Sequence, residues 1–298
     1  MTYVHASWIA AMRQARFEEA WNIAQHILEG RDPKERDNSA LPYHQRWVWD
    51  GHRFEGRHVV VRCYHGLGDT LQFCRFLPLL AARAASVTVE VQRSLVDLLT
   101  AADWPVSLVT FDEQQPIPSS EVDLEITELD FALRARPEIS APPYVKAPPA
   151  ILPRGTVAIC HLAGEWDAER SVPERLFAAI CALSPCITLA PSLSHLPVLN
   201  PRGCPLNMAA TAALVAEARL VITVDTMIAH LAGALGTPTW LLLKAQPDWR
   251  WPVVGSTCAW YPQMRLYRQV QPGDWDTVLA RVAHDLSDYC EMDSRSLT

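Results

Sequence analysis

The chain has 298 residues and a formal net charge of −7, with 49% hydrophobic and 20% charged residues. This balance excludes an intrinsically disordered chain and leaves room for two α/β domains of ordinary size. Lys and Arg form no long run, so we expect no nucleic-acid partner, and no stretch approaches the roughly 20 apolar residues of a membrane span. The eight cysteines lie outside zinc and redox spacings, and the N-terminus lacks the apolar core of a signal peptide. We therefore expect a reduced, cytoplasmic protein.

The first 30 residues have the pattern of two helices. Ser7 is expected to cap the first helix, and residues 17–28 predict the second. One face of the second helix carries small and apolar residues, namely Ala20, Ala24, Ile27 and Leu28. The run ARFEEAW resembles the second helix of a tetratricopeptide repeat. A single repeat cannot bury its own face, so this hairpin either docks on the next domain or begins a longer array that recruits a protein partner.

Residues 46–150 predict a first α/β domain after a hairpin and connector at 1–45. The predicted strands are 57–63 and 86–91, and the predicted helices are 70–85 and 93–102. Short β-branched runs that alternate with helices imply a parallel, doubly wound sheet. The proline-dense tract 141–149 predicts a semi-rigid linker and therefore a domain boundary.

Residues 151–298 predict a second α/β domain. The predicted strands are 156–160, 187–190, 220–224 and 239–243, and the predicted helices are 173–183, 208–218, 227–235 and 277–289. Ligands bind at the carboxyl edge of such sheets, so two of them would face a common cleft.

The strongest candidate site lies within residues 220–238. A buried strand delivers Asp225 and Thr226 to the carboxyl edge of the sheet, and a helix begins at Met227. The first N–H groups of a helix lack partners and the helix dipole favours an anion, so a diphosphate fits there. His230 lies one turn into the helix, on the face that a ligand would approach. The alternative is that Asp225 and Thr226 only cap the helix and that His230 is a packing residue.

The run VDTMIAHLAGALGTP in this segment resembles the Asp-Thr…His-x-Ala motif of glycosyltransferase family 9, the ADP-heptose:lipopolysaccharide heptosyltransferase group. Residues 49–51, 66–75, 247–251 and 260–269 resemble a subgroup of that family fused to tetratricopeptide repeats. The resemblance covers about residues 45–286. It implies a GT-B fold: two doubly wound Rossmann-like domains facing a cleft, here with a short N-terminal helical hairpin.

The same resemblance implies an activity. A hexose or heptose would pass from a nucleotide-diphospho-sugar donor to an acceptor hydroxyl, with inversion and without a metal or another cofactor. The implied acceptor is a glycan, a lipid-linked sugar or a protein.

The glycine turn at Gly66, Gly68 and Asp69 is the second candidate site. It reads G-x-G-x-x-L, with Leu71 where a dinucleotide fingerprint has a third glycine, and Glu90 lies inside a strand. A nicotinamide or flavin site is therefore not favoured. By the family resemblance this loop faces the donor sugar, and Asp69 is the general base that deprotonates the acceptor hydroxyl. Asp69 is also a candidate N-cap for the helix expected to follow it.

Four further residues are candidates for contact with the donor. A leaving nucleoside diphosphate gains negative charge, which nearby cations stabilise. Arg170 and Ser171 match a family position that faces the phosphates. Lys244 follows a predicted strand at its carboxyl end, and Arg250 lies between two tryptophans that would flank the nucleobase or simply pack. A solvated surface position is the alternative for Lys244 and Arg250.

The segment Asp274-Trp275-Asp276 mimics the DxD metal motif of other glycosyltransferases. It comes directly before the last predicted helix, where aspartates commonly cap and complement the helix dipole. We therefore expect capping and no metal site.

Two other functions remain open from the sequence. The chain is alternatively a catalytically degenerate GT-B module that binds nucleotides and interacts through its N-terminal helices. Residues 206–211 lack the acidic residues that family members commonly carry there, and residues 193–205 are short for donor-side loops. A GT-B epimerase is a third possibility, but it requires a richer set of acid–base residues.

Overall fold

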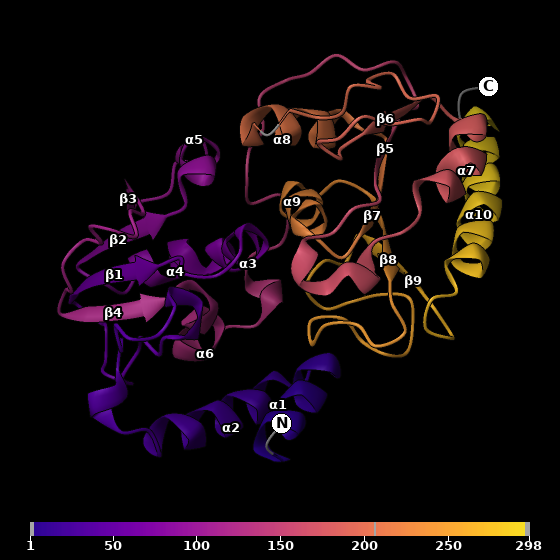
Figure 1. Cartoon of the computed structure of the whole chain (residues 1–298). Coiled ribbons are helices and arrows are strands. Elements are labelled where there is room, and N and C mark those ends of the chain that lie inside the picture. Colours follow the sequence, from indigo (N-terminus) through magenta and orange to yellow (C-terminus); the bar gives the residue numbers. More distant parts are fainter. Residues whose placement is uncertain (1–2, 206, 296–298) are drawn as a thin grey trace. The chain divides into compact units, whose positions relative to one another are not determined.

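The structure, a computed structural model, describes residues 3–205 and 207–295 (Figure 1). Leu206, part of the segment without acidic residues, lies outside the described residues. The chain divides into two compact units, Met1–Lys146 and Ala147–Thr298. Within the described residues, no helix combines the length and apolarity that a bilayer crossing requires.

The N-terminal unit is built on a four-stranded parallel sheet. Its strands are β1 (His58–Arg62), β2 (Ser86–Val91), β3 (Ser107–Thr110) and β4 (Val122–Glu125), in the order β3-β2-β1-β4 (Figure 1). The chain adds β2 and β3 on one side of β1 and β4 on the other. The topological switch point, where ligands bind to open α/β sheets, therefore lies between β1 and β4.

The sequence predicted β1 and β2 but missed β3 and β4. β3 is short and alternates between exposed and half-buried residues. β4 carries Asp123 and Glu125, residue types that strands usually lack. All of β4 is nevertheless buried, and Asp123 accepts a hydrogen bond from Arg62 at 2.9 Å. A partner on a neighbouring strand thus makes a charged strand possible.

The helices of the N-terminal unit are shorter than predicted. After β1 come α3 (Leu67–Phe73), a 3₁₀ turn (Cys74–Phe76) and α4 (Leu77–Ala81) in place of one helix over 70–85. Pro78 lacks the N–H that a continuous helix would use, which favours the tighter turn before it. The other short helices are Pro33–Glu35, Tyr43–Gln45, Arg93–Leu95, α5 (Val96–Thr100), Ile126–Glu128, α6 (Leu129–Leu133) and Pro137–Ile139.

Two N-terminal helices, α1 (Tyr3–Arg13) and α2 (Phe17–Glu29), form the expected hairpin. Ser7 lies inside α1, so its prediction as an N-cap was wrong. The hairpin docks on the Rossmann-like part of its own unit: the buried Trp21 indole N–H donates to Asp130 of α6 at 3.0 Å. Of the two predicted alternatives, the structure thus shows the first: the hairpin docks on the α/β domain that follows it in the chain.

The C-terminal unit contains a five-stranded parallel sheet. Its strands are β5 (Val157–Cys160), β6 (Cys186–Thr188), β7 (Leu220–Val224), β8 (Thr239–Leu243) and β9 (Met264–Arg268), in the order β6-β5-β7-β8-β9. The switch point lies between β5 and β7. The sequence missed β9, an edge strand in which Arg265 is exposed and Arg268 half-buried.

The helices of this unit are mostly those predicted. They are the 3₁₀ segments Glu165–Arg170 and Glu174–Phe177, and α7 (Ala178–Leu183), α8 (Met208–Glu217), α9 (Met227–Leu235) and α10 (Trp275–Arg295). Asp274 accepts a hydrogen bond from the Thr277 N–H at 3.1 Å, so the predicted capping role is confirmed. All eight cysteines fall within the described ranges, where each is a free thiol.

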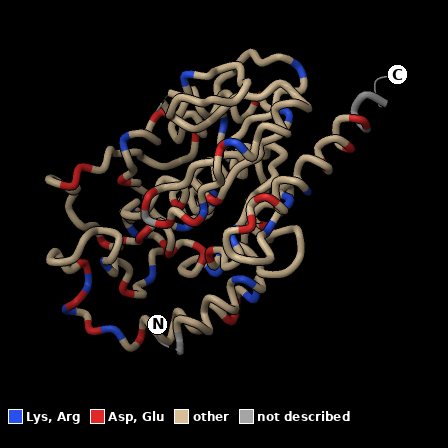
Figure 2. Tube along the Cα trace, turned by 45° about the vertical axis from the view of Figure 1, so that its right-hand side comes forward, with Lys and Arg blue, Asp and Glu red and all other residues tan. Residues whose placement is uncertain are grey.

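Charges of both signs are interspersed along the chain (Figure 2). This pattern agrees with the composition, in which acidic residues slightly outnumber basic ones.

Candidate functional site

Three predicted residues of the C-terminal unit lie at the carboxyl edge of one sheet. Arg170 ends the segment that follows β5, Asp225 directly follows β7, and Lys244 directly follows β8. These strands are neighbours, and the first two flank the switch point. The Arg170 Nη1 donates to the backbone carbonyl of Asp225 at 2.8 Å, which joins the two loops directly.

The start of α9 supplies backbone donors at this edge. Thr226 occupies the N-cap position in an extended conformation, with φ −154° and ψ 178°. Within the described part of the chain its hydroxyl makes no capping hydrogen bond, so the alternative of a simple Thr226 cap is not what the structure shows. The first N–H groups of the helix, beginning at the half-buried Met227, thus keep the character of an anion-binding helix end.

Asp225 is a buried carboxyl in an unusual electrostatic setting. Its side chain is only 7% exposed, and burial is the main cause that raises its pKa to about 6. The nearby Asp248 carboxylate raises the pKa further, whereas Arg170 and Arg250 lower it. Asp225 therefore changes charge close to neutral pH, a property that clusters at functional sites.

Loop carboxylates neutralise the cations that were predicted to meet phosphate. Lys244 Nζ lies 2.9 Å from Asp167 and 3.2 Å from Glu169, and Arg170 Nε lies 3.6 Å from Asp167. The hydrogen bond to Asp167 is the main cause that raises the pKa of Lys244. Ser171 supports the same loop, since its hydroxyl accepts the Ala163 N–H at 3.0 Å. Asp167 and Glu169 were not among the predicted site residues, although both lie just before Arg170.

His230 does not present its ring on an open face, contrary to the prediction. It is 6% exposed, its Nδ1 lies 3.0 Å from the Tyr261 hydroxyl, and its ring stacks on Trp251 at 5.6 Å. A Cβ on Gly233 would lie 2.4 Å from the Tyr261 ring, so glycine is what allows Tyr261 to pack against α9. The packing alternative thus describes His230, and the fully buried Trp251 is not exposed to a nucleobase.

Arg250 is not a solvated surface residue. Its guanidinium pairs with Asp248 at 2.8 Å and lies 4.2 Å from the centre of the Trp249 ring. Its side chain is 11% exposed. Asp248 thus pairs with Arg250, and its charge also acts on Asp225; it was not among the predicted site residues, although it follows β8 closely.

The glycine turn of the N-terminal unit opens α3. Gly66 is the N-cap, Gly68 lies in the first turn, and Asp69 is the third helical residue rather than the N-cap that was predicted. The Asp69 carboxylate accepts the Gly66 N–H at 3.0 Å, and a Cβ on Gly66 would lie 3.2 Å from that carboxylate. Helix α3 therefore begins about one turn earlier than the predicted start at residue 70, because the Asp69 carboxylate reaches back to the N-cap residue Gly66.

Glu90 has a structural role. It is fully buried, pairs with Arg62 at 2.7 Å and accepts the Ile117 N–H at 2.7 Å. Because these partners hold Glu90 inside the sheet, it is not available to bind a ribose, as the acidic residue of a dinucleotide site would.

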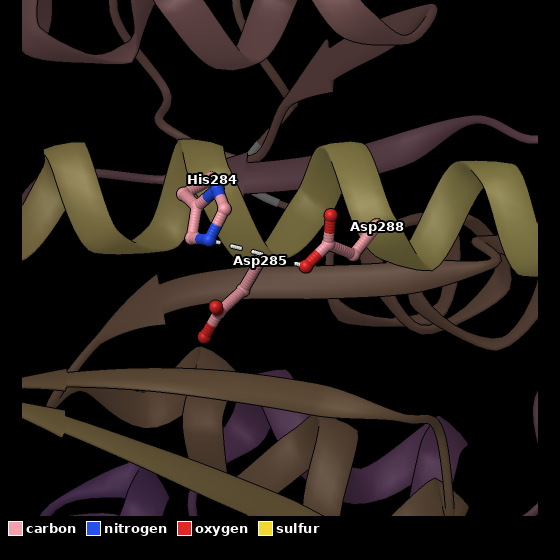
Figure 3. Close-up of side chains that lie close together, drawn as sticks. All are labelled: His284, Asp285 and Asp288. Atoms are coloured by element: carbon pink, nitrogen blue, oxygen red, sulfur yellow. Dashed lines mark ion pairs between the residues drawn. The ribbon is translucent and has the colours of Figure 1, made fainter.

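One group of potential metal ligands occurs among the described residues: His284, Asp285 and Asp288 on α10 (Figure 3). His284 and Asp288 are exposed and lie 4.0 Å apart. Asp285 accepts a hydrogen bond from the Tyr267 hydroxyl at 2.8 Å and pairs with Arg265. A surface ion-pair group explains this arrangement, and we assign it no metal.

Part of the C-terminal unit, including the carboxyl edge formed by β7 and β8, matches a family model. Residues 203–261 match the model of glycosyltransferase family 9 (heptosyltransferase). This segment contains β7, α9 and β8, and with them most of the predicted donor contacts.

One curated protein is similar to part of the chain. Protein FlbA of Caulobacter vibrioides is 35% identical over 95 residues, which are 31% of this chain. The match spans only 15% of the length of FlbA.

Several solved structures share the fold. E. coli ADP-heptose lps heptosyltransferase II has a TM-score of 0.53 and 13% identity, covering 80% of this chain and 99% of its own. The iron-containing dodecameric glycosyltransferase TibC of enterotoxigenic E. coli H10407 has a TM-score of 0.54 and 12% identity, covering 83% and 78%. A family 9 glycosyltransferase of Veillonella parvula DSM 2008 has a TM-score of 0.52 and 10% identity, covering 79% and 98%. The predicted α/β class of GT-B type, with parallel sheets and N-terminal helices, is confirmed.

Proposed function

We propose that the chain is a family 9 glycosyltransferase that moves a hexose or heptose from a nucleotide-diphospho-sugar to an acceptor hydroxyl, with inversion and without a metal. The observation that carries this proposal is the C-terminal switch point. There Arg170, Lys244 and the start of α9, which has no side-chain cap, lie together inside or beside the segment that matches the family model. Oriented N–H groups and cations favour a diphosphate leaving group.

In this proposal the C-terminal unit holds the donor. The first N–H groups of α9 bind the diphosphate, and Arg170 and Lys244 neutralise the charge that develops on it. A diphosphate beside Asp225 would favour its protonated form, so this carboxyl would donate a hydrogen bond instead of repelling the ligand. His230 contributes by holding the aromatic packing under the helix.

Asp69 is the proposed general base. Its carboxylate takes the proton from the acceptor hydroxyl while that oxygen bonds to the anomeric carbon. The bond from this carbon to the diphosphate breaks at the same time, and the diphosphate leaves with the electron pair. Attack from the face opposite the leaving group inverts the configuration. Gly66 and Gly68 would hold the turn that presents Asp69.

A donor screen tests the proposal. ADP-, GDP-, UDP- and dTDP-sugars are scored for a rise in melting temperature and for slow hydrolysis, with the parent protein and with Asp69→Asn. Asparagine keeps an acceptor for the Gly66 N–H, so the variant should bind donor but no longer turn it over. If no nucleotide raises the melting temperature, the proposal fails. Donor binding without turnover by the parent would favour the non-catalytic nucleotide-binding module.

A further inference from the structure

The N-terminal unit contains a large cavity that the proposed donor site does not use. A cavity of about 590 Å³ adjoins a second one of about 410 Å³. The two share five lining residues: Arg31, Trp47, His65, Thr127 and Glu128. We call the combined space the hairpin pocket, because residues of α1, of α2 and of the connector that follows them line much of it.

The hairpin pocket lies where the topology of the sheet favours a ligand. His65 follows β1, and Glu125 ends β4, so the pocket spans the switch point of the N-terminal sheet. Each cavity has a volume typical of small-molecule sites. The position and the size both point to a small-molecule ligand.

Backbone hydrogen bonds fix the polar groups of the pocket. Glu125 lies 2.9 Å from His65 Nδ1 and accepts the Thr127 N–H at 2.6 Å. Glu128 accepts the N–H groups of Glu125 at 2.8 Å and of Trp49 at 3.2 Å. Burial raises the pKa of Glu128 to about 8, so near neutral pH its carboxyl both donates and accepts hydrogen bonds.

Aromatic rings form the remaining wall. The Trp47 indole N–H donates to the Trp49 carbonyl, which fixes the Trp47 ring, and the Arg31 guanidinium lies 5.1 Å from the centre of that ring. Trp8 and Trp21 line the smaller cavity. The acidic side chains Asp32, Glu35 and Glu125 on the wall disfavour a purely anionic ligand, and the charged groups disfavour a purely apolar one. A sugar ring is neither anionic nor purely apolar. Its apolar face stacks on indole, and its hydroxyls form hydrogen bonds with planar carboxyl and guanidinium groups.

We propose that the hairpin pocket binds a saccharide. Under the proposed function, on which this last step rests, that saccharide belongs to the acceptor. The N-terminal hairpin is then part of the substrate site and not only a packing element.

Binding of simple glycosides to the full chain tests the inference. The probes are methyl glycosides of hexoses, heptoses and N-acetylhexosamines at millimolar concentration, detected by saturation-transfer NMR. We expect at least one to bind the parent, and Trp47→Ala and Arg31→Met each to weaken it about tenfold or more. Arg31 is exposed, so Arg31→Met should fold normally even if Trp47→Ala does not. Trp104→Ala is the matched control, because Trp104 does not line the pocket.

The outcomes separate this inference from the proposed function. Absence of glycoside binding to the folded parent would overturn the proposal that the hairpin pocket binds a saccharide. Equal binding by the parent and both variants would overturn it as well. Nucleotide binding is measured in parallel by thermal shift on the same proteins. Glycoside binding that depends on Arg31 and Trp47 supports saccharide binding in the hairpin pocket, whether or not a nucleotide binds. Absence of nucleotide binding contradicts only the proposed transferase function.

Discussion

Replacing Asp225 by asparagine should stabilise the protein at about pH 8 and leave its stability at about pH 3 unchanged. The reason is the cost of keeping a buried carboxylate charged. Its pKa is about 6 in the folded protein against an ordinary value of 3.8. The shift corresponds to at most about 3 kcal/mol.

The sign follows from proton binding. Below the ordinary pKa of 3.8 the carboxyl is protonated in both the folded and the unfolded chain, so it costs nothing. As the pH rises from 3.8 to about 6, the unfolded chain releases its proton first and the free energy of unfolding falls. Above about pH 6 the full penalty is present, and Asp225→Asn removes it.

Denaturant unfolding of both proteins across this pH range measures the effect. Asp248→Asn is the matched comparison: it removes the neighbouring negative charge that raises the pKa of Asp225, so it should give part of the same gain. A stability difference between parent and Asp225→Asn that does not change with pH would refute the reasoning. So would a parent that is the more stable of the two at high pH.

Three further changes test separate contacts. Asp167→Asn releases Lys244 and should tighten binding of a nucleoside diphosphate about two- to fivefold by isothermal calorimetry. Gly233→Ala places a Cβ against the Tyr261 ring and should cost about 1–3 kcal/mol of the free energy of unfolding. Trp21→Phe removes the hydrogen bond from the hairpin to a buried aspartate of α6 and should cost about 1–3 kcal/mol by the same unfolding measurement.

Each of these changes has a control at a position without the contact. Glu165→Gln lies on the same segment as Asp167 and should leave nucleotide affinity unchanged; weaker binding by Asp167→Asn would contradict the competition between carboxylate and phosphate. Gly30→Ala meets only ordinary contacts at 3.7 Å and should be tolerated. Trp104→Phe is the control for Trp21→Phe, and equal costs for the two would mean that the link to the hairpin is not what stabilises the unit.

Much of the fold follows from local sequence. The strands β1, β2, β7 and β8 are short β-branched or apolar runs, and α9 begins and ends at the predicted residues. Gly236 ends α9 in the left-handed region, with φ 74°, which a glycine adopts without strain. Backbone preference and hydrophobic periodicity act over a few residues, so they can be read without knowledge of tertiary contacts.

The strands that were missed depend on distant partners. β4 becomes a buried strand because Arg62 of β1 pairs with its Asp123. β9 is held by its pairing with β8 beside it, although it carries two arginines and its burial follows no regular alternation. Neither partner is visible in the local pattern.

The candidate site divides in the same way. The sequence by itself determined that Asp225, Thr226 and Lys244 follow strands, and a parallel sheet must bring such positions to one edge. Only the tertiary structure decided that Asp167 pairs with Lys244 and that His230 is buried against Trp251. The physical reason is that order along the chain sets which edge a residue reaches, whereas charge, burial and exposure depend on neighbours that the chain brings together only when it folds.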